Sequence, residues 1–299
     1  MAQRKNEEAV GMFNAEALSY RKASILTALG IKKSGFFTPF AYADAVSPDT
    51  QPYDAVERLL AGQSGDFEAR LADFETTLPA FKQAVAHGDV PYEEGGMFPK
   101  LDALAAYHLV RQLKPNRIVE IGSGASTHIM SRALRDNGQS QLQEGQLQEG
   151  QLRCIDPQPR RSIEATGAEI EYRTLAEDDA ELVTDFKAND ILFIDSSHVM
   201  LPGMDVDIQF NRMFPALPRG AIVHVHDIFL PDPYPASWGK RMYSEQNALI
   251  GWLVSGFFEV LFPAYYVATR LEDELHHAIG DLMPTSPSKN AGSMWLRRC

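Results

Sequence analysis

Short apolar segments alternate with helical patterns through the second part of the chain. Segments rich in Val, Ile, Leu and Phe recur, and the stretches between them place apolar residues at helical spacing. An amphipathic helix is expected over Leu101–Leu113, just before the first of these segments. We expect strands at 117–121, 152–156, 169–173, 191–195, 221–226, 257–262 and 293–298. The alternation predicts an α/β fold with a doubly wound, mostly parallel sheet and helices on both faces.

The first 95 residues lack this alternation. Helical spacing is present over Ala15–Leu29 and Asp66–His87, and the stretch Gly35–Pro52 between them is rich in proline and aromatic residues. We therefore expect a helical N-terminal extension or cap over residues 1–95 and the main domain over residues 96–299. A simple packing appendage is the alternative interpretation of the extension.

One apolar region, residues 248–268, approaches the length that a membrane span requires. Glu259 lies in its middle, and two glycines and a proline interrupt it. We expect a helix over Asn247–Val254 followed by a strand rather than a membrane span.

Composition and charge exclude several classes of protein. The 299 residues are 44% hydrophobic and 23% charged, which is typical of a globular domain. The formal net charge of −12 argues against binding to nucleic-acid backbones. The two cysteines, Cys154 and Cys299, predict neither a disulfide framework nor a zinc site. The N-terminus lacks the apolar core of a signal peptide, so we expect a cytoplasmic protein with no membrane partner.

A glycine turn follows the first predicted strand. Gly122, Ser123 and Gly124 separate that strand from a helix beginning near Thr127. Glycines allow a ligand to approach the backbone, and the start of a helix offers unpaired N–H groups. Glu120, two residues before the first glycine, favours a ligand with a positive charge. A turn without a ligand is the structural alternative.

An acid at the end of the second strand adds support for a nucleoside ligand. Asp156 occupies the position from which such acids hydrogen-bond ribose hydroxyls in doubly wound folds. Thr127 stands where the dinucleotide fingerprint requires Gly or Ala, which disfavours NAD. The cofactor-binding residues predicted are Glu120, Gly122, Ser123, Gly124, Thr127 and Asp156.

Two further strand ends carry acids and histidines. Asp195 and His198 follow the fourth strand, and His226 and Asp227 follow the fifth. Because carboxyl ends of parallel strands meet at one crevice, we expect these side chains to converge. Gathered carboxylates repel each other unless a cation compensates, which indicates a divalent metal. His224 lies deeper on its strand, and we interpret it as a core histidine.

These motifs resemble a bacterial-type family of class I S-adenosylmethionine (SAM) methyltransferases. The resemblance rests on the runs Asp190–Val199 and Val223–Pro231, together with the turn at 117–127, and it covers about residues 98–266. It does not cover Gln141–Gln151, where Gln-Leu-Gln-Glu-Gly is repeated in tandem. The resemblance implies a seven-stranded fold with an antiparallel last strand.

A more distant similarity links the chain to metal-dependent sugar O-methyltransferases. It implies that Asp195 ligates a metal and that His198 of the same Asp-x-x-His element acts as the base. It also implies metal ligation by His226 and Asp227, although histidine replaces an acid there. Oxygen ligands favour Mg²⁺, Ca²⁺ or Mn²⁺, and an imidazole also admits a transition metal. A cap on the strand end is the structural alternative for His198.

The sequence therefore predicts a SAM-dependent methyltransferase acting on a hydroxyl of a small polar molecule or sugar. The alternatives are an NAD-dependent Rossmann oxidoreductase and a non-catalytic SAM-binding protein.

Overall fold

The computed structural model describes residues 21–32, 41–42, 45, 50–90, 97–138, 151–280 and 291–299. The chain divides into two compact units, residues 1–50 with 235–242 and residues 51–234 with 243–299. In the smaller unit, residues 21–28 are helical, and the guanidinium of Arg241 lies 4.2 Å from the ring centre of Trp238. The larger unit holds the sheet. Most of the Gly35–Pro52 stretch and the tandem repeat lie outside the described residues.

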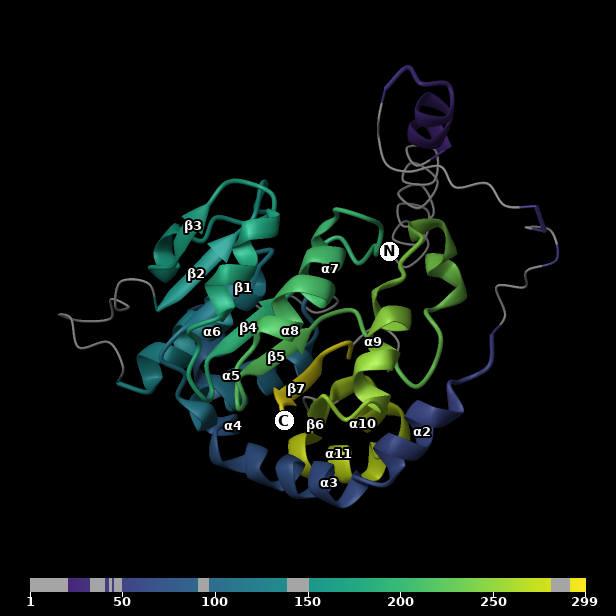
Figure 1. Ribbon diagram of the computed structural model, residues 1–299. Coiled ribbons are helices and arrows are strands. Elements are labelled where there is room, and N and C mark those ends of the chain that lie inside the picture. Colours follow the sequence, from purple (N-terminus) through teal and green to yellow (C-terminus); the bar gives the residue numbers. More distant parts are fainter. Residues whose placement is uncertain are drawn as a thin grey trace, which may run out of the picture. The chain divides into compact units, whose positions relative to one another are not determined.

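A single seven-stranded sheet forms the centre of the larger unit (Figure 1). Its order is β3-β2-β1-β4-β5-β7-β6, and β7 is antiparallel to both of its neighbours. The strands are β1 (Ile118–Ile121), β2 (Leu152–Ile155), β3 (Glu169–Glu171), β4 (Ile191–Ile194), β5 (Ile222–Val225), β6 (Phe258–Pro263) and β7 (Met294–Arg298). Each falls on a predicted segment, and the antiparallel last strand is confirmed.

Helices cover both faces of this sheet (Figure 1). They are α2 (Asp54–Ala61), α3 (Ser64–Asp73), α4 (Leu78–Ala86), α5 (Lys100–Leu113), α6 (Ala125–Asp136), α7 (Asp205–Ile208), α8 (Phe214–Ala216), α9 (Glu245–Val254), α10 (Ala264–Arg270) and α11 (Glu272–Ile279). The larger unit also contains the 3₁₀-helices η2 (Phe74–Thr76), η3 (Glu164–Thr166) and η4 (Glu177–Val183), and the π-helical segment η5 (Gln209–Met213). Because both faces are covered, β1, β4 and β5 are buried along their whole length, which explains their continuous apolar runs.

The histidine in the middle of β5 belongs to the core, as predicted. His224 is fully buried, and its ring stacks on Phe193 of β4 with centroids 3.7 Å apart. Its Nε2 lies 2.8 Å from the hydroxyl of Ser293. Burial and the nearby His226 hold the pKa of His224 well below its usual range, so this imidazole is neutral.

The helices before β1 share the core of the sheet. Phe67, Phe74 and Phe81 are buried in the same hydrophobic cluster as the strands, and the Phe74 ring lies 5.2 Å from that of Phe262 on β6. The helical pattern predicted over Asp66–His87 is present, divided into α3, η2 and α4. The structure thus places α2–α4 with the sheet, whereas the sequence predicted a boundary after residue 95.

The apolar region at 248–268 is divided between α9, β6 and α10, in agreement with the predicted helix and strand. Within the described part of the chain, the helices include none that is long and apolar enough to cross a membrane.

Candidate active site at the strand ends

The glycine turn after β1 packs directly against the end of β4. Gly122 has a φ of +87°, and a Cβ atom there would lie 2.0 Å from the carbonyl oxygen of Asp195. A side chain at Gly122 is therefore excluded by the protein's own backbone. Gly124 differs, because a Cβ atom there would meet no atom within 4 Å. The absence of a side chain at Gly124 leaves open space above the turn.

Glu120 supports this turn from below. It is fully buried and accepts hydrogen bonds from the hydroxyls of Ser126 (2.5 Å) and Thr127 (2.7 Å) and from the thiol of Cys154 (3.2 Å). The Thr127 hydroxyl oxygen also accepts a hydrogen bond from the backbone N–H of Gly124. Burial raises the pKa of Glu120 to about 7. In the structure, Glu120 and Thr127 hold the first turn of α6 in place, and the predicted contact of Glu120 with a ligand stays a prediction.

Asp156 and Ser123 join the ends of β2 and β1. The Ser123 hydroxyl donates to Asp156 at 2.8 Å, and the N–H of Gln158 donates to the other carboxylate oxygen, also at 2.8 Å. Asp156 is almost buried, at 9% exposed, and Ser123 is partly exposed. This arrangement fixes an acid beside the turn, where a ribose could reach it.

The four residues predicted at the ends of β4 and β5 do converge. Nε2 of His198 lies 3.4 Å from a carboxylate oxygen of Asp195 and 3.4 Å from one of Asp227. Nδ1 of His226 lies 3.6 Å from Asp195 and 3.5 Å from Asp227. The imidazoles are buried, whereas the side chains of Asp195 and Asp227 are 36% and 20% exposed. The carboxylates therefore form the accessible surface of this acid–histidine cluster, and the imidazoles lie beneath it.

Two members of the acid–histidine cluster have left-handed backbone conformations. The φ angles are +60° at His198 and +57° at Asp227. Such angles are rare outside glycine and persist only where the surroundings impose them. At His198, the carbonyl oxygen accepts the backbone N–H groups of Ser244 (2.9 Å) and Glu245 (3.2 Å) at the start of α9. The start of α9 thus anchors the loop after β4.

Two buried acids behind the cluster are functional candidates that the sequence did not reveal. A carboxylate oxygen of Glu245 lies 2.8 Å from Nδ1 of His198, and one of Asp102 lies 3.5 Å from Nε2 of His226. Both side chains are fully buried. The sequence did contain a signal for Asp102, because this residue is an acid within the otherwise apolar pattern of α5. Glu245 had no such signal, because an acid in the first turn of a helix is ordinary.

The charges in the cluster compensate each other. Burial lowers the pKa of His198, but hydrogen bonds with Asp195 and Glu245 outweigh it and raise the pKa to about 10. Burial likewise opposes protonation of His226, but the charge of Asp195 and the nearby carboxylate of Asp102 raise its pKa well above the usual value. The two imidazoles in turn hold the pKa of Asp195 well below its usual range, although the surrounding protein partly desolvates this carboxylate. At neutral pH both imidazoles are therefore cationic, and the predicted base His198 already carries its proton.

The side chains as arranged do not fit a metal ion. Within the described ranges, no group of three or more His, Cys, Asp or Glu side chains could hold one. Both ring nitrogens of the predicted ligand His226 face carboxylates, on one side Asp195 and Asp227 and on the other Asp102. Ligation of a metal by Asp195, His226 and Asp227 stays a prediction.

Comparisons with known proteins agree with the motifs. The family model described as "Methyltransferase domain" matches residues 119–228, which run from β1 to just beyond β5. An uncharacterized protein of Archaeoglobus fulgidus is 55% identical over 38 residues, a match that spans 13% of this chain and only 17% of that relative's length.

Several solved methyltransferase structures are similar to this chain, at low sequence identity. The O-methyltransferase of Bacillus cereus in complex with SAH is 17% identical over 75% of this chain and 91% of its own, with a TM-score of 0.39. The SAH-bound methyltransferase PaMTH1 of Podospora anserina is 17% identical over 89% of this chain and 99% of its own, with a TM-score of 0.39. The MycE methyltransferase of the mycinamycin pathway, bound to Mg, SAH and mycinamycin VI, is 15% identical over 66% of this chain and 48% of its own, with a TM-score of 0.35.

The family match covers the glycine turn, Asp156 and the acid–histidine cluster, and the strand order of the sheet confirms the predicted fold class. Over residues 119–228, the motifs that resemble class I SAM-dependent methyltransferases thus coincide with the match to a methyltransferase family model.

Proposed function

We propose that this protein transfers the methyl group of SAM to a hydroxyl oxygen of a small polar molecule, with sugars as the first candidates. The observation that carries the proposal is the packing of the glycine turn on Asp195, because it places a cofactor-type turn against the acid–histidine cluster. Ligands of open α/β sheets bind in the crevice beyond the carboxyl ends of the strands, where both features lie.

The cofactor is assigned to the ends of β1 and β2. Asp156, held by Ser123 and Gln158, would accept the ribose hydroxyls. The open space at Gly124 would admit the ligand close to the backbone. Glu120 and Thr127 act as positioning residues that keep the start of α6 in place. SAM supplies an electrophilic methyl group on a sulfonium.

The acceptor is assigned to the accessible face of the cluster. A hydroxyl there would donate a hydrogen bond to the carboxylate of Asp195 or Asp227, which makes its oxygen more electron-rich. As the new C–O bond forms and the methyl–sulfur bond breaks, the hydroxyl proton would pass to that carboxylate and from it to solvent, because the low pKa of Asp195 does not let it keep the proton. The cationic imidazoles of His198 and His226 hold the two carboxylates in place. His198 could itself accept the proton only after losing one of its own.

The test is a transfer assay with methyl-labelled SAM and a panel of sugars and hydroxylated small molecules. The proposal predicts a labelled O-methyl product with the wild-type protein. In Asp195→Asn, the rate of methyl transfer should fall by about 10²-fold or more, the usual scale for a proton acceptor. The variant should still bind SAM. Transfer to nitrogen or carbon acceptors alone would contradict the proposal. A parallel arm with EDTA tests the metal prediction, since full activity after chelation would remove the metal from the account.

A further inference from the structure

The ring of Tyr243 lies against the imidazole of His198 in the acid–histidine cluster. The two ring centres are 4.7 Å apart and the rings are inclined at 43°, a separation at which aromatic rings attract each other. Both ring nitrogens of His198 face carboxylates. Asp195 and Asp227 lie on the Nε2 side, and Glu245 lies on the Nδ1 side. The Tyr243 ring and the two accessible carboxylates therefore surround the same imidazole.

Tyr243 has accessible surface, unlike the aromatic ring on the other imidazole of the cluster. Phe98 lies against His226, with ring centres 5.1 Å apart. Phe98 is only 7% exposed and belongs to the hydrophobic core, whereas Tyr243 is half-buried. A molecule bound to the accessible carboxylates of the cluster can therefore contact Tyr243, while Phe98 serves the packing of the core.

Contacts on both sides fix the position of Tyr243. The next residue, Ser244, donates its backbone N–H to the carbonyl oxygen of His198 at 2.9 Å. The ring of Tyr234 meets that of Tyr243 at 75°, with centres 5.7 Å apart. The Tyr234 hydroxyl oxygen in turn accepts the backbone N–H of Gln246 at 3.3 Å. Both tyrosines are half-buried, and together they form a fixed aromatic wall beside the cluster.

An aromatic wall next to hydrogen-bond acceptors matches the two chemical surfaces of a sugar ring. The carbon-bound hydrogens on one face of a sugar carry partial positive charge, and the face of an aromatic ring is negative. The hydroxyl groups at the rim of the sugar are donors, and ionised carboxylates are acceptors. Small-molecule sites combine aromatic walls with a few placed polar groups in this way. A linear polyol offers the same hydroxyl groups but no ring face, so such a wall distinguishes the two.

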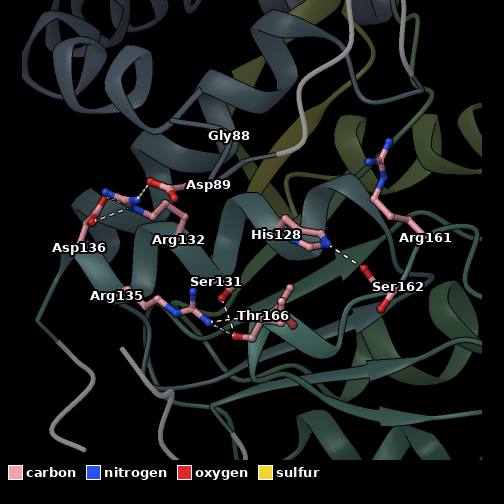
Figure 2. A pocket seen from close by; sticks show the side chains of 11 residues that line it. Gly88, Asp89, His128, Ser131, Arg132, Arg135, Asp136, Arg161, Ser162 and Thr166 are labelled. Atoms are coloured by element: carbon pink, nitrogen blue, oxygen red, sulfur yellow. Dashed lines mark hydrogen bonds and ion pairs between the residues drawn. The ribbon is translucent and has the colours of Figure 1, made fainter. Parts of the chain in front are cut away.

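The concave surface on the outer side of α6 differs from this site (Figure 2). Arg132 there joins Asp89 and Asp136, and the hydroxyl of Ser131 donates to the carbonyl oxygen of Thr166 at 2.7 Å. Among the described residues that line this surface, none is Phe, Tyr or Trp. Its contacts join α6 to the neighbouring segments, and the features that suit a sugar lie at the strand ends instead.

We infer that Tyr243 determines specificity in the acceptor site, and that the acceptor is a sugar whose ring stacks on Tyr243 while a hydroxyl donates to Asp195 or Asp227. The inference rests on the proposed function, which places the acceptor at the accessible face of the cluster. It goes further, because it names the residue that selects a ring over an open chain. The Tyr243 ring takes no part in bond making, so it should stabilise the bound acceptor and the transition state equally.

The test is ligand-observed saturation-transfer NMR of the full chain, which measures binding without methyl transfer. The probes are methyl β-D-glucopyranoside, methyl β-D-galactopyranoside, methyl α-D-mannopyranoside and the open-chain polyol sorbitol. At least one glycoside should bind, with the strongest transfer to the hydrogens of one ring face, and sorbitol should bind more weakly than that glycoside. This comparison needs no variant. The inference is overturned if no glycoside binds or if sorbitol binds as well as the glycosides do.

Variants then test Tyr243 itself. Tyr243→Leu removes the ring but keeps an apolar side chain, and it should weaken glycoside binding about 3- to 10-fold, the scale of one aromatic contact. Tyr243→Phe keeps the ring and should bind as the wild type does. Tyr172→Leu is the matched control, because Tyr172 is a tyrosine that is 66% exposed and follows the edge strand β3. Equal losses in Tyr172→Leu and Tyr243→Leu, or no loss in either, would overturn the assignment.

Kinetics separate this inference from the proposed function. With a glycoside that the transfer assay accepts, Tyr243→Leu should raise KM about 3- to 10-fold and leave kcat nearly unchanged, since it removes uniform binding. A fall in kcat alone would make Tyr243 a support for His198 and contradict its role in specificity. Methyl transfer to open-chain alcohols only would keep the proposed function and overturn the sugar site. Glycoside binding without any methyl transfer would contradict the proposed function alone.

Discussion

The carbonyl oxygen of Asp195 lies 2.0 Å from the position that a Cβ atom on Gly122 would occupy. The strand end that carries the acid of the cluster and the turn assigned to the cofactor are thus in direct backbone contact. This relationship separates two glycines that look equivalent in the sequence, and it leads to opposite predictions for them.

Gly122→Ala should destabilise the fold, since the new methyl group must displace the end of β4 and the backbone has a φ of +87°. We expect a loss of about 2–5 kcal/mol in the free energy of unfolding, measured by urea denaturation. Gly124→Ala is the matched variant. It should unfold like the wild type but bind SAM about 1–3 kcal/mol more weakly, because its methyl group enters the space assigned to the cofactor. The reverse pattern would contradict the assignment of the turn.

Glu245→Gln tests the charge state of the cluster without an acceptor substrate. The Glu245 carboxylate raises the pKa of His198, so its removal should lower that pKa from about 10 toward the usual value. The measurement is an NMR titration of the histidine ring protons. Because Gln can still accept the hydrogen bond from Nδ1, the loss of stability should be limited to about 1–3 kcal/mol. An unchanged titration of His198 would mean that Glu245 does not set its charge.

His108 should make the stability of the fold depend on pH. Burial lowers its pKa to about 4, and its Nδ1 lies 2.9 Å from the Thr77 hydroxyl. Between pH 6.5 and 4 the unfolded chain therefore binds more protons than the folded one, and stability falls as the pH falls. The contribution of His108 is complete above pH 6.5, and about 3 kcal/mol of it should be lost by pH 4.

The control for this pH effect is His108→Asn, which keeps a polar atom near Thr77 but does not titrate. Unfolding free energies of the two proteins should differ by a constant amount above pH 6.5. Below it, the wild type should lose stability faster than the variant. Parallel curves from pH 7 to pH 4 would show that the pKa of His108 is the same in the folded and the unfolded protein, which would contradict the prediction.

The sequence was sufficient to predict the strands and the residues at their ends, because local pattern and sheet topology determine where these lie. Each predicted strand is present, and Asp195 and Asp227 converge because the ends of adjacent parallel strands share one edge. The sequence could not show that Glu120 is enclosed by three donors, because that depends on how α6 packs over β1 and β2. It could not show Glu245 either, since α9 reaches His198 only through tertiary packing. Because the carboxylate of Glu245 raises the pKa of His198, the structure has a protonated imidazole where the sequence predicted a neutral one.

Binding of SAM at the ends of β1 and β2 is the central claim, and isothermal calorimetry of the wild type, Asp156→Ala and Asp178→Ala tests it most directly. Asp178 is an exposed acid and serves as the matched control. The account predicts that the wild type binds SAM and not NAD. Loss of a buried charged hydrogen-bond partner should weaken SAM about 10- to 100-fold in Asp156→Ala, with no change in Asp178→Ala. Undiminished SAM affinity in Asp156→Ala, or binding of NAD in place of SAM, would contradict it.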